Sequence, residues 1–553
     1  MKSRYISLMN DTLYAYSVEH MLRYFDDVKK NGLKEHGFPR LTANIGILIA
    51  HGYRTELTDM FIEMMDFCCK NVPIVKAAND FSVKELIFCI MALEKNGGVS
   101  KECTERWRND LATIEPKNCY TVYAKSADDE LHNWALFTAV SEHMRKVIGL
   151  RDTTDFVDLQ LITQLRNLDQ NGMYRDPNNP MVYDLVPRGL FSVLLHFGYN
   201  GKYFSEIDEA LKKAGLLTLK MQSVTGEIPY GGRSNQFMHN EAHLAIVFEF
   251  EAKRYAKEGN MALAGKFKLG VELALDNIAH WLSKKPMRHI KNRFPTETKY
   301  GCEEYAYFDK YMITTASFLY AASLICDESI PSAEEGEQKP YTLTLPEHFH
   351  KTFMAAGGYF LEFDTNADPH YDASGLGRVH KKGAPSTVCC SLACAKHPNT
   401  VLDVENASDI SLCAGYVTEN QSRFATDCRY EVTELCSDES SAHCTIKNTF
   451  DDGKILISSY GLDQNGVSVT VKGEGDVLYM LPAFVFDGEE NTVIEPADRS
   501  LKISYKGYTC IYEADGVIFD TSLVGGNRNG HFRAFAAKGN GELNVRIRIE
   551  KSL

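Results

Sequence analysis

The sequence predicts an α+β protein of separate domains: an N-terminal (α/α) toroid of helix hairpins, then a C-terminal antiparallel β-sandwich. The main observation is a change of period. Up to about residue 328 apolar residues recur at steps of three and four, and in the later part of the chain they alternate with polar ones. The length of 553 residues also suits two or more domains. We therefore expect the toroid at 1–328, a linker at 329–347 and the β-sheet domain at 348–553.

The helical period is clearest in segments of ordinary globular length, separated by short Gly, Pro and Asn breaks. Examples are 83–95, 133–150, 156–168, 241–259, 265–285 and 312–325. More than ten such helices, joined as hairpins with no strand between them, predict a solenoid or a closed toroid of helix pairs.

The segment that follows the helices is polar, with three prolines and an acidic cluster, and it is typical of a linker. Beyond it, stretches such as KILISSYG and ELNVRIRIEK alternate apolar and polar residues between Gly, Asn and Asp turns. This period of two is expected where one face of each strand is buried, so it predicts an antiparallel β domain.

Composition narrows the classes of partner. The chain has 74 acidic and 60 basic side chains, a formal net charge of -14, which disfavours nucleic acid and anionic membranes. No apolar run is long enough to span a bilayer, and the first twenty residues lack the apolar region of a secretory signal. The 15 cysteines are scattered without a CxxC pair, as expected for reduced thiols. We expect a cytoplasmic protein with no nucleic-acid or membrane partner.

The densest polar stretch is GEIPYGGRSNQFMHNEAHLA (226–245), just ahead of a predicted helix. A turn is expected at Pro229 and the two glycines, and the helix is expected to begin near Asn240 or Glu241. Free N–H groups at a helix start, together with Arg233, favour an anion. The candidate side chains for binding and proton transfer are Glu227, Tyr230, Arg233, Asn235, His239 and Glu241. The alternative is a helix capped by Asn240, but a cap does not need Arg, two His and Tyr together.

His239 and His243 have the spacing of helical metal ligands. The glutamate of a zinc protease motif would follow the first histidine directly, whereas Glu241 comes two residues later. No third ligand stands nearby at a suitable spacing. We therefore expect no metal.

Three further polar stretches precede or interrupt predicted helices: 128–137, 172–189 and 288–312. In 128–137 an Asn at the helix start can bind a carboxylate, and the Trp beside it can support a sugar face. The stretch 172–189 is a long loop in a helical array, and such loops are often functional. Tyrosines interleaved with acids likewise suit a carbohydrate. These stretches contribute His132, Asn133, Trp134, Tyr183, Arg188, Tyr305 and Tyr307. Helix capping and core packing are the alternative explanation.

The stretch 357–386 opens the predicted β domain and contains GLGRVH. It lacks the strand–loop–helix context and the GK[ST] ending of a phosphate loop, so we expect no nucleotide there. Arg378 and His380 would instead project toward the helical domain and add positive charge to an interdomain cleft.

The stretches GEIPYGGRSNQFMHNEA, HNW and YDASGLGRVHKKGAPS, together with the two-domain organisation, resemble the heparinase II/III-like and oligoalginate-lyase group of carbohydrate enzymes. Within that group they look closest to β-glucuronidases of glycoside hydrolase family 154. The resemblance spans most of the chain. It implies an exo-acting β-glucuronidase that binds a glucuronide or a uronate-containing oligosaccharide without an organic cofactor.

The alternative chemistry is an exo-acting lyase that cleaves next to a uronate by β-elimination. In the lyases of this group an Asn or Arg neutralises the uronate carboxylate, and Tyr or His groups move the protons. A hydrolase needs two carboxyl groups beside the bond instead. The available acids are Glu227, Glu241, Glu303 and Glu304. The residues present serve both chemistries.

We expect the following side chains to act in catalysis: Tyr183, Arg233, His239, Glu241 and Tyr305. The expected substrate-binding set is His132, Asn133, Trp134, Arg188, Glu227, Tyr230, Asn235, Tyr307, Arg378 and His380. A carbohydrate-binding scaffold is the non-enzymatic alternative, but so many titratable groups exceed what passive binding needs. A homodimer is also considered, since helical toroids with a β domain often associate.

Overall fold

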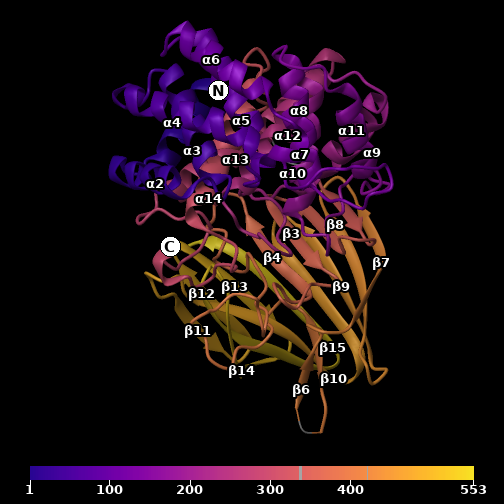
Figure 1. Ribbon diagram of the computed structural model, residues 1–553. Coiled ribbons are helices and arrows are strands. Elements are labelled where there is room, and N and C mark those ends of the chain that lie inside the picture. The colour runs from indigo at the N-terminus through magenta and orange to yellow at the C-terminus, as the bar shows by residue number, and fades with distance from the viewer. Residues whose placement is uncertain (335–338, 420, 553) are drawn as a thin grey trace.

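The computed structural model describes residues 1–334, 339–419 and 421–552, and its N-terminal part is helical. Figure 1 shows these helices as one body above the strands. The helices are α1 (Lys2–Leu13), α2 (Val18–Asn31), α3 (Gly37–Ala50), α4 (Thr58–Asn71), α5 (Val83–Asn96), α6 (Lys101–Ala112), α7 (Pro116–Cys119), α8 (Trp134–Val147), α9 (Thr154–Leu165), α10 (Val182–His196), α11 (Phe204–Met221), α12 (His239–Lys257), α13 (Met261–Leu282) and α14 (Phe308–Ile325), with short 3-10 turns at Thr55–Leu57, Val72–Ile74, Asn79–Phe81 and Thr296–Thr298.

The helices form a closed ring with an inner and an outer layer. The inner helices α3, α5, α8, α10, α12 and α14 bury most of their residues, and α3 buries all of them. An outer helix such as α2 buries only one stripe, Met21, Phe25 and Val28. The last helix, α14, packs against α1 and α3, which closes the ring. The structure therefore contains the predicted toroid.

The C-terminal part is built from antiparallel strands in two sheets. One sheet has the order β1-β2-β3-β4, and the other has the order β11-β12-β13-β15-β10-β9-β8-β7, in which β14 also pairs with β15, β5 pairs with β10, and β6 pairs with β5. The strands are β1 (Tyr341–Leu345), β2 (Lys351–Ala356), β3 (Tyr359–Asp364), β4 (Gly375–Lys381), β5 (Ala414–Val417), β6 (Ser422–Phe424), β7 (Arg429–Ser437), β8 (Ala442–Thr449), β9 (Ile455–Asp463), β10 (Gly466–Phe486), β11 (Val493–Ala497), β12 (Ser500–Tyr505), β13 (Tyr508–Ala514), β14 (Val517–Gly526) and β15 (His531–Lys551).

The two sheets share one apolar core. Leu361 and Val379 of the small sheet belong to the same buried cluster as Val469 and Ile547 of the large one. Burial alternates along β8, as expected for a strand with one face in the core. The domain is therefore the predicted β-sandwich.

The small sheet lies against the helical ring. In Figure 1 the upper ends of β3 and β4 of the small sheet, together with β8 of the large one, meet the loops at the lower end of the helices. A separate apolar cluster joins Met173 and Met181 of the helical part to Phe353 and Phe360 of the small sheet. These contacts fix the helical loops against the β domain, and the candidate site lies in these loops.

The expected linker at 329–347 is only partly irregular. Strand β1 lies inside it and pairs with β2, with Tyr341 opposite Ala355. The proline and acidic residues hid the alternation of the short YTLTL segment. Residues 335–338 of that stretch lie outside the described residues.

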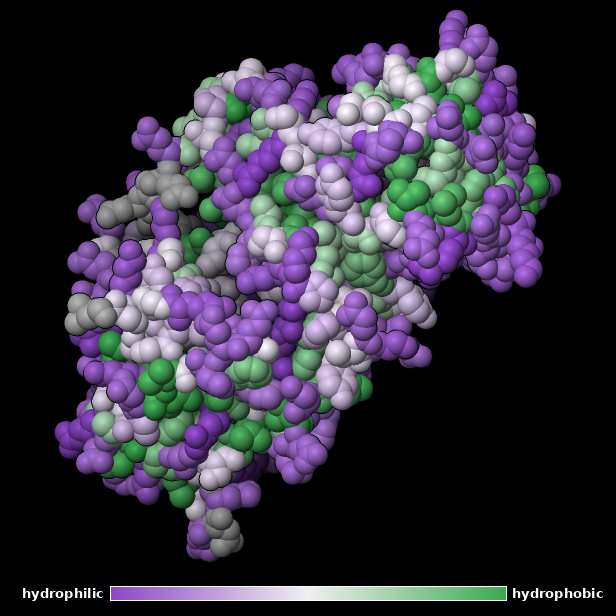
Figure 2. All heavy atoms as spheres, turned by 90° about the vertical axis from the view of Figure 1, so that its left-hand side faces the viewer, coloured by the Kyte–Doolittle hydropathy of each residue, from purple (hydrophilic) through white to green (hydrophobic). Residues whose placement is uncertain are grey.

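The surface is mostly polar. Figure 2 shows hydrophilic residues over most of one face, with hydrophobic ones in separate patches. Within the described residues no helix combines the length and apolarity needed to cross a membrane.

Candidate active site

The polar stretch between α11 and α12 forms an irregular loop that is buried at most of its positions. Gly232 has a φ of 74°, and a side chain there would clash with Pro180. Ser234 and Gln236 also have positive φ values, 59° and 65°. Non-glycine residues rarely adopt this conformation, and where they do the position is often functional.

Helix α12 begins at His239, slightly ahead of the predicted start, and Asn240 is not its cap. The residue before the helix is Met238, and its side chain makes no capping hydrogen bond. The Asn240 side chain instead donates to the Ser234 carbonyl at 3.2 Å, so it braces the loop.

Three hydroxyl groups form a chain at the mouth of the inner helices. The Oγ of Ser234 lies 3.0 Å from the Tyr183 hydroxyl and 2.9 Å from the Tyr305 hydroxyl. Tyr183 comes from the first turn of α10, and Tyr305 lies just ahead of α14 and is 37% exposed. The structure thus brings together two predicted catalytic tyrosines through a serine that sequence reasoning did not single out.

Arg233 and Asn133 share an acidic partner beside these hydroxyls. Arg233 forms an ion pair with Asp176, and its guanidinium lies 4.6 Å from the centre of the Tyr183 ring. The Asn133 amide donates to the other oxygen of Asp176 at 2.7 Å. We call Asn133, Asp176, Tyr183, Arg233, Ser234 and Tyr305 the tyrosine–arginine cluster.

Two further predicted binding residues lie at the exposed edge of this cluster. Trp134 is 38% exposed and packs edge-on against Phe81. His132 is exposed, and its pKa is lowered by partial burial and by the nearby Arg233. An exposed indole and a neutral imidazole beside a cation suit an acidic sugar.

Burial and a neighbouring carboxylate keep the phenols protonated. The pKa of Tyr305 is raised by burial and by the charge of Glu303. That of Tyr183 is raised by burial, by Tyr311 and by Glu303. The Ser234 hydroxyl acts against these shifts in both cases because it hydrogen-bonds to the phenol oxygens. The charge of Glu303 is thus part of the site's acid–base balance.

His239 lies behind the cluster. Its ring stacks on Tyr311 with centroids 5.6 Å apart, and it is 3% exposed. Burial and the charge of Arg40 lower its pKa to about 3. His239 and His243 contact each other edge-on. Among the described residues no group of three His, Cys, Asp or Glu side chains is arranged to hold a metal ion.

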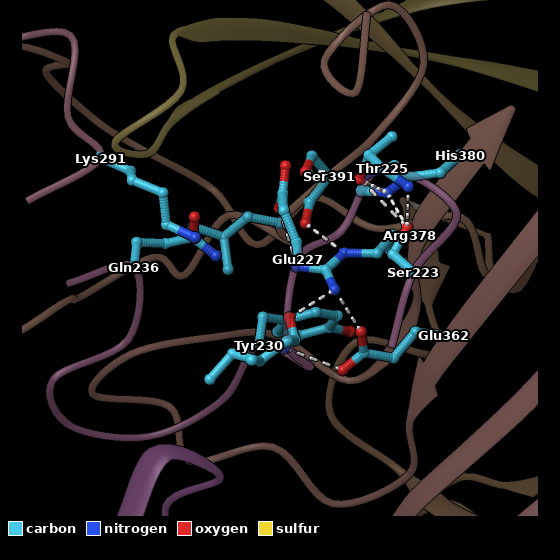
Figure 3. Close-up of polar contacts among 12 residues, drawn as sticks. Ser223, Thr225, Glu227, Tyr230, Gln236, Lys291, Glu362, Arg378, His380 and Ser391 are labelled. Carbon is cyan, nitrogen blue, oxygen red and sulfur yellow. Dashed lines mark hydrogen bonds and ion pairs between the residues drawn. The ribbon is translucent and has the colours of Figure 1, made fainter. Parts of the chain in front are cut away.

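Four of the predicted binding residues lie in a buried network between the domains. Figure 3 shows Arg378 at its centre, with Glu227 and Tyr230 from the helical loop and Glu362 from β3 around it. Arg378 donates to the Ile228 carbonyl at 2.8 Å and pairs with Glu362 at 2.9 Å. The Tyr230 backbone N–H donates to Glu362 at 3.0 Å, and a side chain at Gly377 would strike the Tyr230 hydroxyl.

His380 belongs to the same network. Its Nδ1 lies 2.6 Å from the Ser223 hydroxyl and its Nε2 lies 2.8 Å from Ser391. Arg378 and His380 therefore project toward the helical domain, but both are buried, so they brace the loop instead of lining an open cleft.

The other predicted residues have separate settings. Glu241 is buried and pairs with Lys291 at 2.6 Å. Arg188 is buried and bonds Asp184 and Thr218 inside the ring. Asn235 is buried with its amide 3.5 Å from Asp372, and Tyr307 is 57% exposed at the start of α14. Of these, only Tyr307 has a side chain at the surface.

Sequence reasoning missed Asp176, Ser234, Asp372 and Arg528. Asp176 and Ser234 stood inside stretches that were already selected, and the glycine pair ahead of Ser234 was a usable signal for an unusual backbone. Asp372 likewise stood inside the selected stretch 357–386, whereas Arg528 lies in the β domain outside every selected stretch, and no local pattern marks it.

No protein-family model matches the sequence, and no curated protein matches it. Solved structures do resemble it. A mutant of the heparan sulfate lyase HepC from Pedobacter heparinus matches 93% of this chain and 77% of its own, with 10% identity and a TM-score of 0.52. A structure of heparinase III matches 93% and 77% of the two chains, with 8% identity and a TM-score of 0.50. This chain has the fold of these polysaccharide lyases, and at such identities the likeness concerns the fold alone.

Proposed function

We propose that the protein is a carbohydrate-active lyase that acts at the end of a chain and cleaves next to a uronate by β-elimination. The observation that carries the proposal is the chain of hydroxyls Tyr183–Ser234–Tyr305 beside Arg233, with 3.0 and 2.9 Å between successive oxygens. The tyrosine hydroxyls can transfer protons, and Arg233 beside them can bind a carboxylate, so both tasks of the reaction are served in one place.

The proposed reaction begins with the uronate carboxylate bound by the N–H groups that Arg233 and the Asn133 amide have beyond those bonded to Asp176. Neutralising this carboxylate makes the proton on C5 of the sugar more acidic. Tyr305, the more exposed phenol, takes that proton as the phenolate, which is its minor form because burial and Glu303 raise its pKa, and which becomes more populated as the pH rises. The C4–O bond breaks as the C4–C5 double bond forms, and the leaving oxygen receives a proton from Tyr183 or from Tyr305. Ser234 lies between the two phenols, so it can pass a proton from one to the other. No water is consumed.

Hydrolysis of a terminal glucuronide, to which the sequence resemblance points, has less support from the geometry. It needs two carboxyl groups on either side of the scissile bond. Glu241 is buried against Lys291, Glu303 is buried against Arg528, and Glu227 is buried beside Arg378. Of the three, only Glu303 faces the phenols, and its two oxygens are held by Arg528 and by the backbone N–H of Ser234. These three acids therefore do not supply a pair of carboxyl groups at the exposed phenol, where the hydroxyl chain ends.

The test uses two substrates side by side. One is an unsulfated oligosaccharide with 4-linked uronates, followed by the ultraviolet absorbance of the unsaturated product. The other is 4-nitrophenyl β-D-glucuronide, followed by nitrophenolate. We expect the first signal without the second, with one small unsaturated sugar released at a time. Nitrophenolate with free glucuronic acid would instead establish hydrolysis, and binding without either signal would indicate a carbohydrate-binding protein.

A further inference from the structure

Arg528 connects the β domain to the loop that carries the candidate site. It lies in the turn between β14 and β15, and its side chain is buried. Its Nε donates to the Gly301 carbonyl at 2.6 Å, and the rest of the guanidinium bonds the Asn235 carbonyl and the Glu303 carboxylate. One side chain therefore ties together three segments distant in sequence.

Glu303 bonds both Arg528 and Ser234, so it connects Arg528 to the hydroxyl chain. Its Oε2 accepts a hydrogen bond from the Arg528 guanidinium, and its Oε1 accepts one from the backbone N–H of Ser234 at 3.0 Å. Ser234 has a positive φ, so its backbone needs external contacts to stay in this conformation. The Oγ of the same residue lies between the hydroxyls of Tyr183 and Tyr305.

We propose that Arg528 is a positioning residue of this site: through Glu303 it fixes the Ser234 backbone, and it neutralises the Glu303 carboxylate, which faces the phenols. This inference rests on the proposed function for its effect on turnover. A fork of three donors suits the task because it fixes the carboxylate and two carbonyls at once. A buried carboxylate without a cation would also be costly.

The electrostatic part of the proposal involves a small set of groups. The charged and titratable neighbours of Glu303 are Arg528, Cys302, Tyr183, Tyr305 and Tyr311, and Arg233 and Tyr371 also face Tyr305. With Arg528 removed, the charge of Glu303 acts unopposed on the phenols and makes their ionisation harder.

The test compares Arg528→Met with Arg293→Met. Arg293 is also a buried arginine between the domains; its side chain pairs with Asp403 and reaches the Asn527 carbonyl beside Arg528 at 3.4 Å, but it does not contact Glu303. Two measurements are made: hydrogen exchange of residues 231–238, which needs no substrate, and the pH dependence of kcat/KM on the uronate oligosaccharide. For Arg528→Met we expect hydrogen exchange of residues 231–238 to become several-fold faster. The acid limb of the kcat/KM profile should move by about one pH unit toward alkaline pH, because the phenols ionise less easily. Arg293→Met should change neither.

Further variants separate charge from shape. Arg528→Lys keeps the charge without the fork, so it should lower kcat and leave the acid limb in place. Glu303→Gln in the Arg528→Met background should return the limb toward its original position, and Glu303→Gln alone should move it the opposite way. Arg528→Lys and Glu303→Gln alone do not contain the Arg528→Met change, so they still decide the question if Arg528→Met fails to fold.

Equal pH profiles and equal exchange in Arg528→Met and Arg293→Met would overturn the proposal. Loss of stability with an unmoved pH profile would mean that Arg528 only supports the fold. If the unmodified protein cleaves no uronate, the proposed function fails, and the exchange measurement still decides whether Arg528 fixes Ser234.

Discussion

Replacing Ser234 with alanine is the most direct test of the hydroxyl chain. The change removes one oxygen and keeps both tyrosines, and that oxygen lies 3.0 and 2.9 Å from their hydroxyls. Each such hydrogen bond contributes about 0.5–1.5 kcal/mol. If both are needed in the transition state, about 1–3 kcal/mol is lost, and kcat falls about 5- to 150-fold.

A glycine variant at the same position provides the matched comparison. Ser234 has a φ of 59°, a conformation that costs alanine about as much as serine but costs glycine little. Ser234→Gly should therefore lose as much kcat as Ser234→Ala and yet be more stable than it by about 1 kcal/mol, after the larger unfolded-state entropy of glycine is included.

The assay is kcat on the uronate oligosaccharide together with urea unfolding of each variant. Turnover within about twofold of the unmodified protein in both variants would refute the role of Ser234 as a relay. A loss of kcat that follows stability rather than the missing oxygen would point to backbone strain as the cause.

Three other predictions follow from the same contacts. Lys291→Met leaves the buried Glu241 carboxylate unpaired, so urea unfolding should show a loss of about 3–5 kcal/mol, most of it recovered when Glu241→Gln is added; an unchanged midpoint would contradict this. Burial raises the pKa of Asp372 from 3.8 to about 7 in the folded protein, so the stability it contributes is full below pH 3.8 and is lost as the pH rises through 7. The stability of Asp372→Asn relative to the unmodified protein should therefore grow across this range by a few kcal/mol, and a constant difference would be evidence against it. Arg233→Met should lower kcat/KM about 10- to 100-fold on a uronate, because a charged hydrogen bond is lost, and should have little effect on the methyl ester of the same sugar, whereas equal losses on both would argue against carboxylate binding.

Local periodicity was enough to predict the two domains. The predicted helix at 83–95 is α5 (Val83–Asn96), and the strand predicted from KILISSYG is β9 (Ile455–Asp463). Both signals come from residues a few positions apart, because a helix or strand buries one face at a fixed spacing. The short strand β1 was missed because five residues among prolines and acids give too little periodicity.

Local sequence pattern predicted only part of the candidate site. The stretch around Arg233 and the tyrosines Tyr183 and Tyr305 were selected as polar groups at helix starts, and the structure brings them together. Local pattern could not separate them from Glu227, Tyr230 and Arg378, whose chemistry is similar but which lie in a buried network. The difference is exposure, which depends on how the small sheet covers the loop.

The sequence alone determined which part of the chain is helical and which part is built from strands, the order of the two domains and the inventory of tyrosines, carboxylates and cations. Only the tertiary structure decided which charges neutralise one another and which groups stay available to a substrate. Arg528 and Asn235 are 293 residues apart and yet in contact. A buried carboxylate needs a cation, and any of several arginines and lysines would satisfy that need. The choice among them is made by the packing of the two domains.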